Sequence, residues 1–381
     1  MKKILAMLLA LVMVLSLAAC GAKNEPAAPA AEYKVAMVTD YGDITDQSFN
    51  QTTYEACKAY AEANNVEFTY YKPAGDSDAE RVAMIEKAVD EGYNVIVLPG
   101  FAFAAAIAQA APAYPEVKFI ALDVAELDLL SAGLTAETMT NVYSAVYQEE
   151  LSGYMAGYAA VKLGYTKLGF LGGMAVPAVQ KFGYGFVQGA DAAAKEMGIN
   201  IDMNYIYGGL FYGTADITAV MDTWYQGGTE VVFACGGGIY TSAVDAAKKV
   251  AGAKVIGVDV DQAGVIANYA GDADTSLTVT SAMKGLYPTT VDTLTDVINN
   301  GNWAKYSGKV ATLGLVSGED PTANYVQIPM ESTQWSDTFT QDDYKALVKG
   351  MFDGTITVSA DVSVEPTVTN VNVDYQGQIV G

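Results

Sequence analysis

Short apolar runs rich in β-branched residues alternate with helical patterns from residue 33 onward, and this alternation constrains the fold more than any other feature. Runs that are apolar nearly throughout are typical of strands covered on both faces. Alternation of strand and helix predicts a parallel sheet with right-handed crossovers. The first series has strands at 34–39, 67–71, 94–99 and 118–123, with helices at 51–64, 79–91 and 104–114.

A second series of the same kind follows and predicts a second lobe. It begins after a strand at 141–147 and a helix at 149–162. Its strands are expected at 167–171, 201–207, 230–234 and 254–258, and its helices at 186–197, 217–226 and 241–250. Small residues in the helix at 149–162 would let it approach a sheet closely. The fold class is therefore α/β, with two doubly wound, Rossmann-like lobes. Near the end, Thr340 and Asp343 predict a capped helix to about 352, and 354–381 is expected to be extended edge structure.

The first residues have the pattern of a secretory signal. Lys2 and Lys3 precede an apolar run at 4–15, and Leu17-Ala18-Ala19-Cys20 matches a bacterial lipobox. We expect cleavage of 1–20, a lipid on Cys20 and a flexible Ala/Pro tether at 21–32. The protein would then lie on the extracytoplasmic face of the cell membrane. An ordinary cleaved signal with an incidental cysteine is the alternative.

Composition excludes several functions. The chain has no histidine, so histidine-dependent triads and the usual zinc sites are absent. A formal net charge of −23 disfavours binding of nucleic-acid polymers. Cys57 and Cys235 lie in apolar patterns and are expected to be small buried hydrophobes. No catalytic residue, metal or cofactor is predicted.

The loop after the first strand is the first candidate site, because ligands of open parallel sheets bind outside the carboxyl ends of the strands. In this loop we expect Asp46, Phe49 and Asn50 to face a cleft. Ser48 and Gln51 form a capping-box pattern, so Ser48 is predicted to cap the next helix. Ser77 and Glu80 form a second capping box.

The second lobe supplies further candidates. Glycines at 172–173 and 183–189 depart from the dinucleotide fingerprint, so NAD binding is disfavoured. Asp259, after a buried strand, could accept hydrogen bonds from adjacent hydroxyls, as in ribose recognition. Its Asp-x-Asp pattern with Asp261 lacks a full metal-ligand set. Glycines 236–238 would let the backbone approach a ligand, and Lys284 places a cation near the start of a helix.

These blocks, in this order, resemble the basic membrane protein family of lipoproteins, which includes purine nucleoside receptors that serve ABC importers. The resemblance runs from about residue 33 to about 318. It is carried by Thr39-Asp40, 45–51, Phe119-Ile120-Ala121-Leu122-Asp123, 148–157, 169–173, 258–262, and Thr280-Ser281 with Lys284.

The resemblance implies the type I periplasmic-binding-protein fold, with two lobes joined by crossover segments. It implies that Asp259 and Lys284 hold ribose hydroxyls with the backbone near Gly237, and that Asp46 and Asp123 hold the base. Phe49 and Phe211 would stack on the base. For the domain boundaries, we expect 33–146 plus about 264–306 in lobe 1, and 147–263 plus about 307–353 in lobe 2, with the tail at 354–381 unassigned.

The resulting interpretation is a lipid-anchored solute-binding protein of an ABC importer. Its expected ligand is a nucleoside, with a purine as the expected base, and its partners are a permease and an ATPase. The alternatives are the same fold binding a sugar or another neutral polar solute, a surface hydrolase acting on glycans or nucleosides through paired carboxylates, and a signalling receptor without a transport role.

Overall fold

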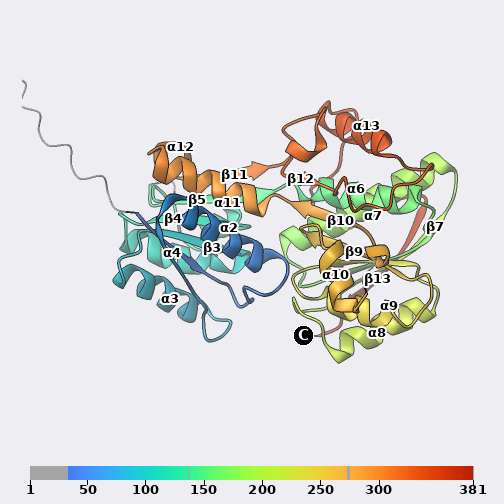
Figure 1. The fold of residues 1–381 in the computed structure, drawn as a ribbon, viewed down its shortest axis with the longest axis horizontal. Helices are drawn as coiled ribbons and strands as arrows, with labels where there is room; N and C mark the ends of the chain where they lie inside the picture. The colour runs from blue at the N-terminus through green and yellow to red at the C-terminus, as the bar shows by residue number, and fades with distance from the viewer. Residues whose placement is uncertain (1–32, 136, 273–274, 381) are drawn as a thin grey trace, which may run out of the picture. The chain divides into compact units, whose positions relative to one another are not determined.

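The computed structural model describes residues 33–135, 137–272 and 275–380 and contains two separate sheets (Figure 1). The predicted signal, tether and Cys20 lie outside the described residues. The first sheet has the order β11-β5-β4-β3-β1-β2, and its strands pair in parallel. These strands are β1 (Lys34–Val38), β2 (Glu67–Tyr71), β3 (Val95–Pro99), β4 (Lys118–Leu122), β5 (Val142–Tyr147) and β11 (Lys309–Leu313).

The second sheet has the order β12-β10-β9-β8-β6-β7-β13. Only its edge strand β12 runs antiparallel to its neighbour among the described strands. The strands are β6 (Lys167–Gly172), β7 (Ile201–Tyr207), β8 (Val231–Cys235), β9 (Lys254–Asp259), β10 (Thr278–Lys284), β12 (Val326–Gln327) and β13 (Val371–Gln378).

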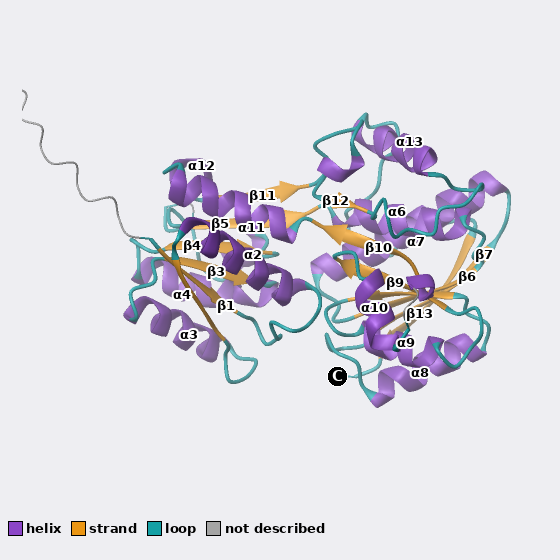
Figure 2. Cartoon of the chain, viewed as in Figure 1, coloured by secondary structure: helices purple, strands orange, loops and turns teal. Residues whose placement is uncertain are grey.

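Helices flank the strands of each sheet (Figure 2). The first lobe carries α2 (Phe49–Asn64), α3 (Asp78–Asp90), α4 (Ala104–Ala113), α5 (Glu126–Ser131), α11 (Leu286–Leu294) with the π-helical turn Thr295–Asn299, and α12 (Trp303–Tyr306). The second carries α6 (Glu149–Lys162), α7 (Pro177–Met197), α8 (Ala215–Gln226), α9 (Tyr240–Ala247), α10 (Ala263–Ala270) and α13 (Gln341–Phe352). The α/β fold with two doubly wound lobes is confirmed.

The core of the second lobe shows why its strands are apolar on both faces. Phe170 and Phe233 pack with α6 and α7, whereas their neighbours Leu171 and Val232 pack with α8 and α9. Successive strand residues point to opposite faces, so each face needs its own apolar set. Cys235 belongs to the first of these clusters, and both Cys57 and Cys235 are buried and free, as expected.

Helix α7 corrects two predictions. It begins at Pro177 rather than at 186, because close packing against α6 sets its glycine-rich first half. A Cβ on Gly153 of α6 would lie 2.2 Å from the carbonyl oxygen of Phe182, and one on Gly185 of α7 would lie 2.1 Å from that of Glu150. The small residues of α6 thus serve its contact with a helix rather than a sheet.

The predicted lobe boundaries are wrong at two places. β10 and the preceding α10 were assigned to lobe 1 but belong to lobe 2, since β10 pairs with β9. β11 was assigned to lobe 2 but pairs with β5 of lobe 1. Strand pairing over a long sequence distance decides both cases, and local pattern does not carry that information.

The lobe crossovers meet at one place. The chain passes between the lobes at 147–149, at 284–286 and between β11 and β12. Backbone hydrogen bonds tie these segments together: the Gln148 amide donates to the Leu313 carbonyl at 2.9 Å, and the Gly285 amide donates to the Tyr325 carbonyl at 2.7 Å. Such a junction of a few element-terminal residues is suited to act as a hinge.

Candidate ligand-binding site

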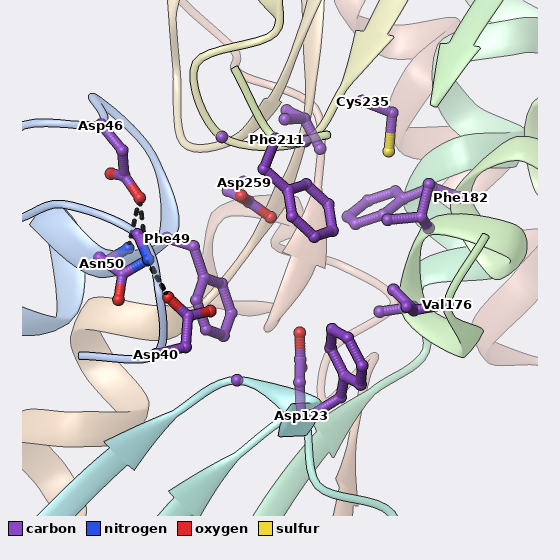
Figure 3. Close-up of a pocket in the computed structure, with 18 of the residues that line it drawn as sticks. Asp40, Asp46, Phe49, Asn50, Asp123, Val176, Phe182, Phe211, Cys235 and Asp259 are labelled. Atoms are coloured by element: carbon purple, nitrogen blue, oxygen red, sulfur yellow. Dashed lines mark hydrogen bonds between the residues drawn. The ribbon is translucent and has the colours of Figure 1, made fainter. Parts of the chain in front are cut away.

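A cavity of about 350 Å³ lies between the lobes, at the carboxyl ends of both sets of strands (Figure 3). This volume is within the range of small-molecule sites. The structure brings all predicted ligand-binding residues to its walls: Asp46, Phe49, Asn50, Asp123, Phe211, Gly237, Asp259 and Lys284. Their individual contacts with a ligand stay predictions.

Two carboxylates occupy matching positions in the lobes. Asp123 directly follows β4, and Asp259 ends β9, the strand with the corresponding place in the second sheet. Their φ angles are 61° and 65°, the left-handed region that non-glycine residues seldom adopt. Strained backbone that aims a polar side chain into a cavity is characteristic of binding sites.

Lys284 joins these carboxylates. Its Nζ bonds Asp123 Oδ2 and lies 3.8 Å from Asp259 Oδ1 and 3.6 Å from Glu149 Oε1. Burial opposes its charge, but the surrounding carboxylates outweigh burial and raise the pKa of Lys284 above its ordinary value. The ammonium also lies 4.7 Å from the ring centre of Phe49 and 5.6 Å from that of Phe182.

The buried carboxylates hold their charge less easily than exposed ones. Burial raises the pKa of Asp259, and Lys284 acts against that effect. Burial raises the pKa of Glu149 to about 7, again opposed by Lys284. The side chain of Glu149 also contacts Lys181, at 3.5 Å from Nζ. The Lys284 ammonium thus balances the charge of several buried carboxylates. Removing it would leave their negative charge uncompensated.

Asp46 organises the first loop rather than presenting free oxygens. Its Oδ1 accepts from the amides of Ser48 and Gln51, and its Oδ2 from the amide and Nδ2 of Asn50, at 2.9–3.2 Å. These bonds cap α2 and fill the usual acceptor positions of a carboxylate.

The predicted capping role of Ser48 is wrong. Its hydroxyl makes no cap bond to α2 and instead donates to Asp259 Oδ2 at 2.5 Å, joining the lobes. Asp46 satisfies the helix terminus, which frees the serine hydroxyl for this contact. Ser77, in the same sequence pattern, accepts from the Glu80 amide as predicted. A second link between the lobes runs from Gln262 Nε2 to the Gln47 carbonyl at 3.1 Å.

Aromatic rings form much of the remaining wall. Phe49, Phe182 and Phe211 converge on the same space as Asp259 (Figure 3). Phe211 stacks on Tyr41 of the first lobe, with ring centres 6.2 Å apart and planes 20° from parallel.

The glycines at 236–238 line the cavity and also make room for the loop that carries Phe211. A Cβ on Gly236 would lie 2.7 Å from Phe211 Cδ1, and one on Gly237 would lie 2.7 Å from the Phe211 carbonyl oxygen. The absence of side chains at these glycines therefore leaves space for Phe211, which lines the cavity.

Two buried oxygens of first-lobe residues that line the cavity have no hydrogen-bond partner among the described residues. They are Asp123 Oδ1 and Asn50 Oδ1, both inaccessible to bulk water. A buried acceptor without a partner is costly, so each is suited to accept a hydrogen bond from a ligand. Asn50 Nδ2, by contrast, donates to Asp40 and Asp46.

Asp40, Glu149 and Phe182 are cavity residues that were not among the predicted site residues. Asp40 is held by the Gly42 amide and Asn50, and burial raises its pKa to about 6. Its position just beyond β1 could have revealed it, as could the position of Glu149 just beyond β5. No local signal marks Phe182, which lies in the part of α7 that was not predicted to be helical.

Within 33–135, 137–272 and 275–380, no cluster of acidic or cysteine side chains is arranged to hold a metal ion. Over the same residues, no helix is both long enough and apolar enough to cross a bilayer.

Comparison with solved structures identifies the fold. A solute-binding protein of an ABC transporter from Aeropyrum pernix aligns with a TM-score of 0.66, covering 85% of this chain and 87% of that chain at 22% identity. One from Conexibacter woesei aligns at 0.64, covering 86% and 99% at 22% identity. The protein has the type I periplasmic-binding-protein fold of solute-binding proteins.

The family follows from the sequence. The model of the Bmp family, described as "ABC transporter substrate-binding protein PnrA-like", matches residues 33–345. The chain belongs to this family, a class of transport proteins rather than enzymes. It is an ABC transporter substrate-binding protein, so a small-molecule ligand and transporter subunits are its partners.

Named relatives agree with this assignment. The ABC transporter nucleoside-binding protein BmpA of Lactococcus lactis is 29% identical over 300 residues, covering 75% of this chain and 80% of the relative. Basic membrane protein A of Borreliella burgdorferi is 29% identical over 233 residues, covering 60% and 64%. An uncharacterised lipoprotein of Pyrococcus furiosus is 26% identical, covering 83% and 77%.

Proposed function

We propose that this protein binds a nucleoside, with a purine as the base, between its lobes and delivers it to an ABC importer. The supporting observation is the combination of aromatic rings with hydroxyl-binding charged groups around one cavity of about 350 Å³. A nucleoside has a flat base, suited to stacking, and a sugar with adjacent hydroxyls. The name of the Lactococcus lactis relative supports the same ligand class.

The proposed roles follow the geometry of each group. Asp259 and Lys284 take the ribose hydroxyls, since a carboxylate accepts and an ammonium donates hydrogen bonds. Phe49 and Phe211 stack on the base. Asp123 binds the base through its unpartnered Oδ1, and Asn50 does the same, which is a role we assign in place of direct contact by Asp46.

We assign Asp46 instead to holding the first loop, because its own backbone bonds fill its acceptor positions. Ligand binding then closes the lobes by bending at the crossover segments. The Ser48–Asp259 hydrogen bond and the Asp123–Lys284 ion pair accompany closure. The closed form is the one that the permease would receive.

Calorimetric titration with adenosine, inosine, guanosine and cytidine tests the nucleoside proposal. We expect purine nucleosides to bind more tightly than cytidine, because larger rings stack over more area. A panel of pentoses and hexoses serves as the comparison. Heat with a sugar and none with any nucleoside would reject the proposal in favour of the sugar-binding alternative.

Membrane attachment through Cys20 is a separate proposal. It is supported by the lipobox pattern and by relatives named lipoproteins. Expression of wild-type and Cys20→Ala chains with a radiolabelled fatty acid tests it. Label and membrane association should be found with the wild type alone, and equal membrane association of both chains would contradict the anchor.

A further inference from the structure

The last strand of the second lobe lies outside the residues that the family model matches. The match ends at 345, whereas β13 spans Val371–Gln378 and extends the second sheet as a parallel edge strand beside β7. The tail before it is held to α7, where Gln188 exchanges hydrogen bonds with the backbone of Ser359 at 2.9 and 3.0 Å. The extended tail was predicted, but not its partner strand.

Beyond β13, the tail reaches the loop that carries Phe211. The amide of Ile379 donates to the Tyr207 carbonyl at 2.9 Å, and that of Val380 donates to the Gly208 carbonyl at 3.2 Å. β7 ends at Tyr207, so these bonds extend the pairing from the strand into the loop. A bulge between Tyr375 and Gln378 redirects the tail just before this contact.

The contact at the loop is close. Gly209 has a φ of 85°, and a Cβ on it would lie 1.9 Å from the carbonyl oxygen of Val380. On its other side, the loop bonds the end of β6, where the Gly209 amide donates to the Gly173 carbonyl at 2.9 Å. The loop is thus held between β6 and the tail, two residues before Phe211.

We propose that the tail is a positioning element for the ligand site. Ile379 and Val380 fix the backbone at 208–209, and the fixed backbone holds the Phe211 ring against the cavity and against Tyr41. The ligand-affinity part of this inference rests on the proposed nucleoside function. The first lobe has no such support, because β2, its strand corresponding to β7, pairs only with β1 among the described strands.

The test uses a chain that stops after Gln378, which keeps β13 paired and removes the contact with the loop together with the packing of Ile379 against the cluster under α8 and α9. Hydrogen–deuterium exchange without ligand should become faster at 208–213 and stay unchanged at 142–147 in β5. Affinity for the tightest-binding nucleoside should fall about five- to tenfold, the scale of losing part of one stacking contact. Gln188→Ala is the matched control, and it should leave affinity unchanged.

A double-mutant cycle separates positioning from general destabilisation. In a Phe211→Ala background, shortening the chain should cause no further loss of affinity, because the tail acts through that ring. An equal loss in both backgrounds would overturn the proposal, as would unchanged exchange at 208–213. If no nucleoside binds the full chain, the proposed function fails, and the exchange experiment alone then decides whether the tail holds the loop.

Discussion

The two lobes share the same order of their central strands, but they carry different residues at the carboxyl ends of those strands. An aspartate with left-handed backbone, Asp123, directly follows β4, and another, Asp259, ends β9. The neighbouring strands differ: β5 ends at the uncharged Tyr147, whereas β10 ends at Lys284. Lys284 of the second lobe therefore balances carboxylates of both lobes.

The first loops of the lobes differ in the same way. After β1, the chain places Asp40 and Asp46 around Asn50, whereas after β6 it places Gly173 and a short turn. The second lobe draws its aromatic wall from the loop after β7. The comparison teaches that both lobes supply acids to the cavity, whereas Lys284 of the second lobe supplies the cation shared by Asp123, Asp259 and Glu149, so charge couples the lobes.

Removing Lys284 should break this coupling and have the largest effect. Lys284→Met leaves Asp123, Asp259 and Glu149 without their buried cation. We expect the free energy of unfolding at pH 7 to fall by about 3–5 kcal/mol, as when one partner of a buried pair is removed. Urea denaturation followed by circular dichroism measures it.

The matched control is Lys349→Met, which removes a lysine from exposed ion pairs with Glu319 and Asp353. Exposed pairs contribute little, so no measurable change is expected. Equal unfolding midpoints for the two variants would show that Lys284 does not balance the buried acids.

Substituting Asp259 and Asp123 in turn tests whether the second lobe binds the sugar and the first lobe binds the base. Asp259→Ala should weaken inosine about 10- to 100-fold, the range for a hydrogen bond to a charged group. It should have little effect on 2′,3′-dideoxyinosine, which lacks the hydroxyls. Asp123→Ala should weaken both ligands by the same factor. Calorimetry gives the four affinities, and a preference for inosine that survives Asp259→Ala would contradict the ribose role.

The sequence predicted which residues line the site better than it predicted the hydrogen bonds that those residues make. Strand ends are visible as the last residues of apolar runs, so Asp123, Asp259 and Lys284 could be found from pattern and resemblance. The lobe assignments of β10 and β11 could not be found in this way, because pairing with distant segments places β10 in the second lobe and β11 in the first. Phe182 was missed because tertiary packing against α6, rather than helix propensity, extends α7 over glycines.

Asp40 should give the first lobe a distinctive pH dependence. Burial raises its pKa from 3.8 to about 6, so between these values the folded protein holds a proton that the unfolded chain releases. The free energy of unfolding should therefore fall as the pH rises through this window, by about 2–3 kcal/mol. Asp40→Asn should make the fall smaller by this amount and leave the part that comes from Glu149, whose pKa burial raises to about 7. Asn50 Oδ1, which has no partner, can turn to accept from the new amide.

Urea denaturation at intervals between pH 4 and pH 8 measures both slopes. The control is Asp320→Asn. The hydroxyl and amide of Thr322 lower the pKa of Asp320, so this group stabilises the fold above its pKa and its removal should act in the opposite direction. Parallel pH profiles for the wild type and Asp40→Asn would show that Asp40 does not hold the proton.

The smallest effect concerns two serines with the same capping-box pattern. Ser77→Ala should lower the free energy of unfolding by about 1 kcal/mol, because its hydroxyl caps α3. Ser48→Ala should leave α2 capped by Asp46 but remove the contact with Asp259 across the lobes. We therefore expect a severalfold loss of nucleoside affinity, on the scale of one hydrogen bond, which Ser77→Ala should not produce. Denaturation and calorimetry on both variants separate the roles: if Ser48→Ala changes stability alone, its hydroxyl caps the helix after all, and the lobes close without it.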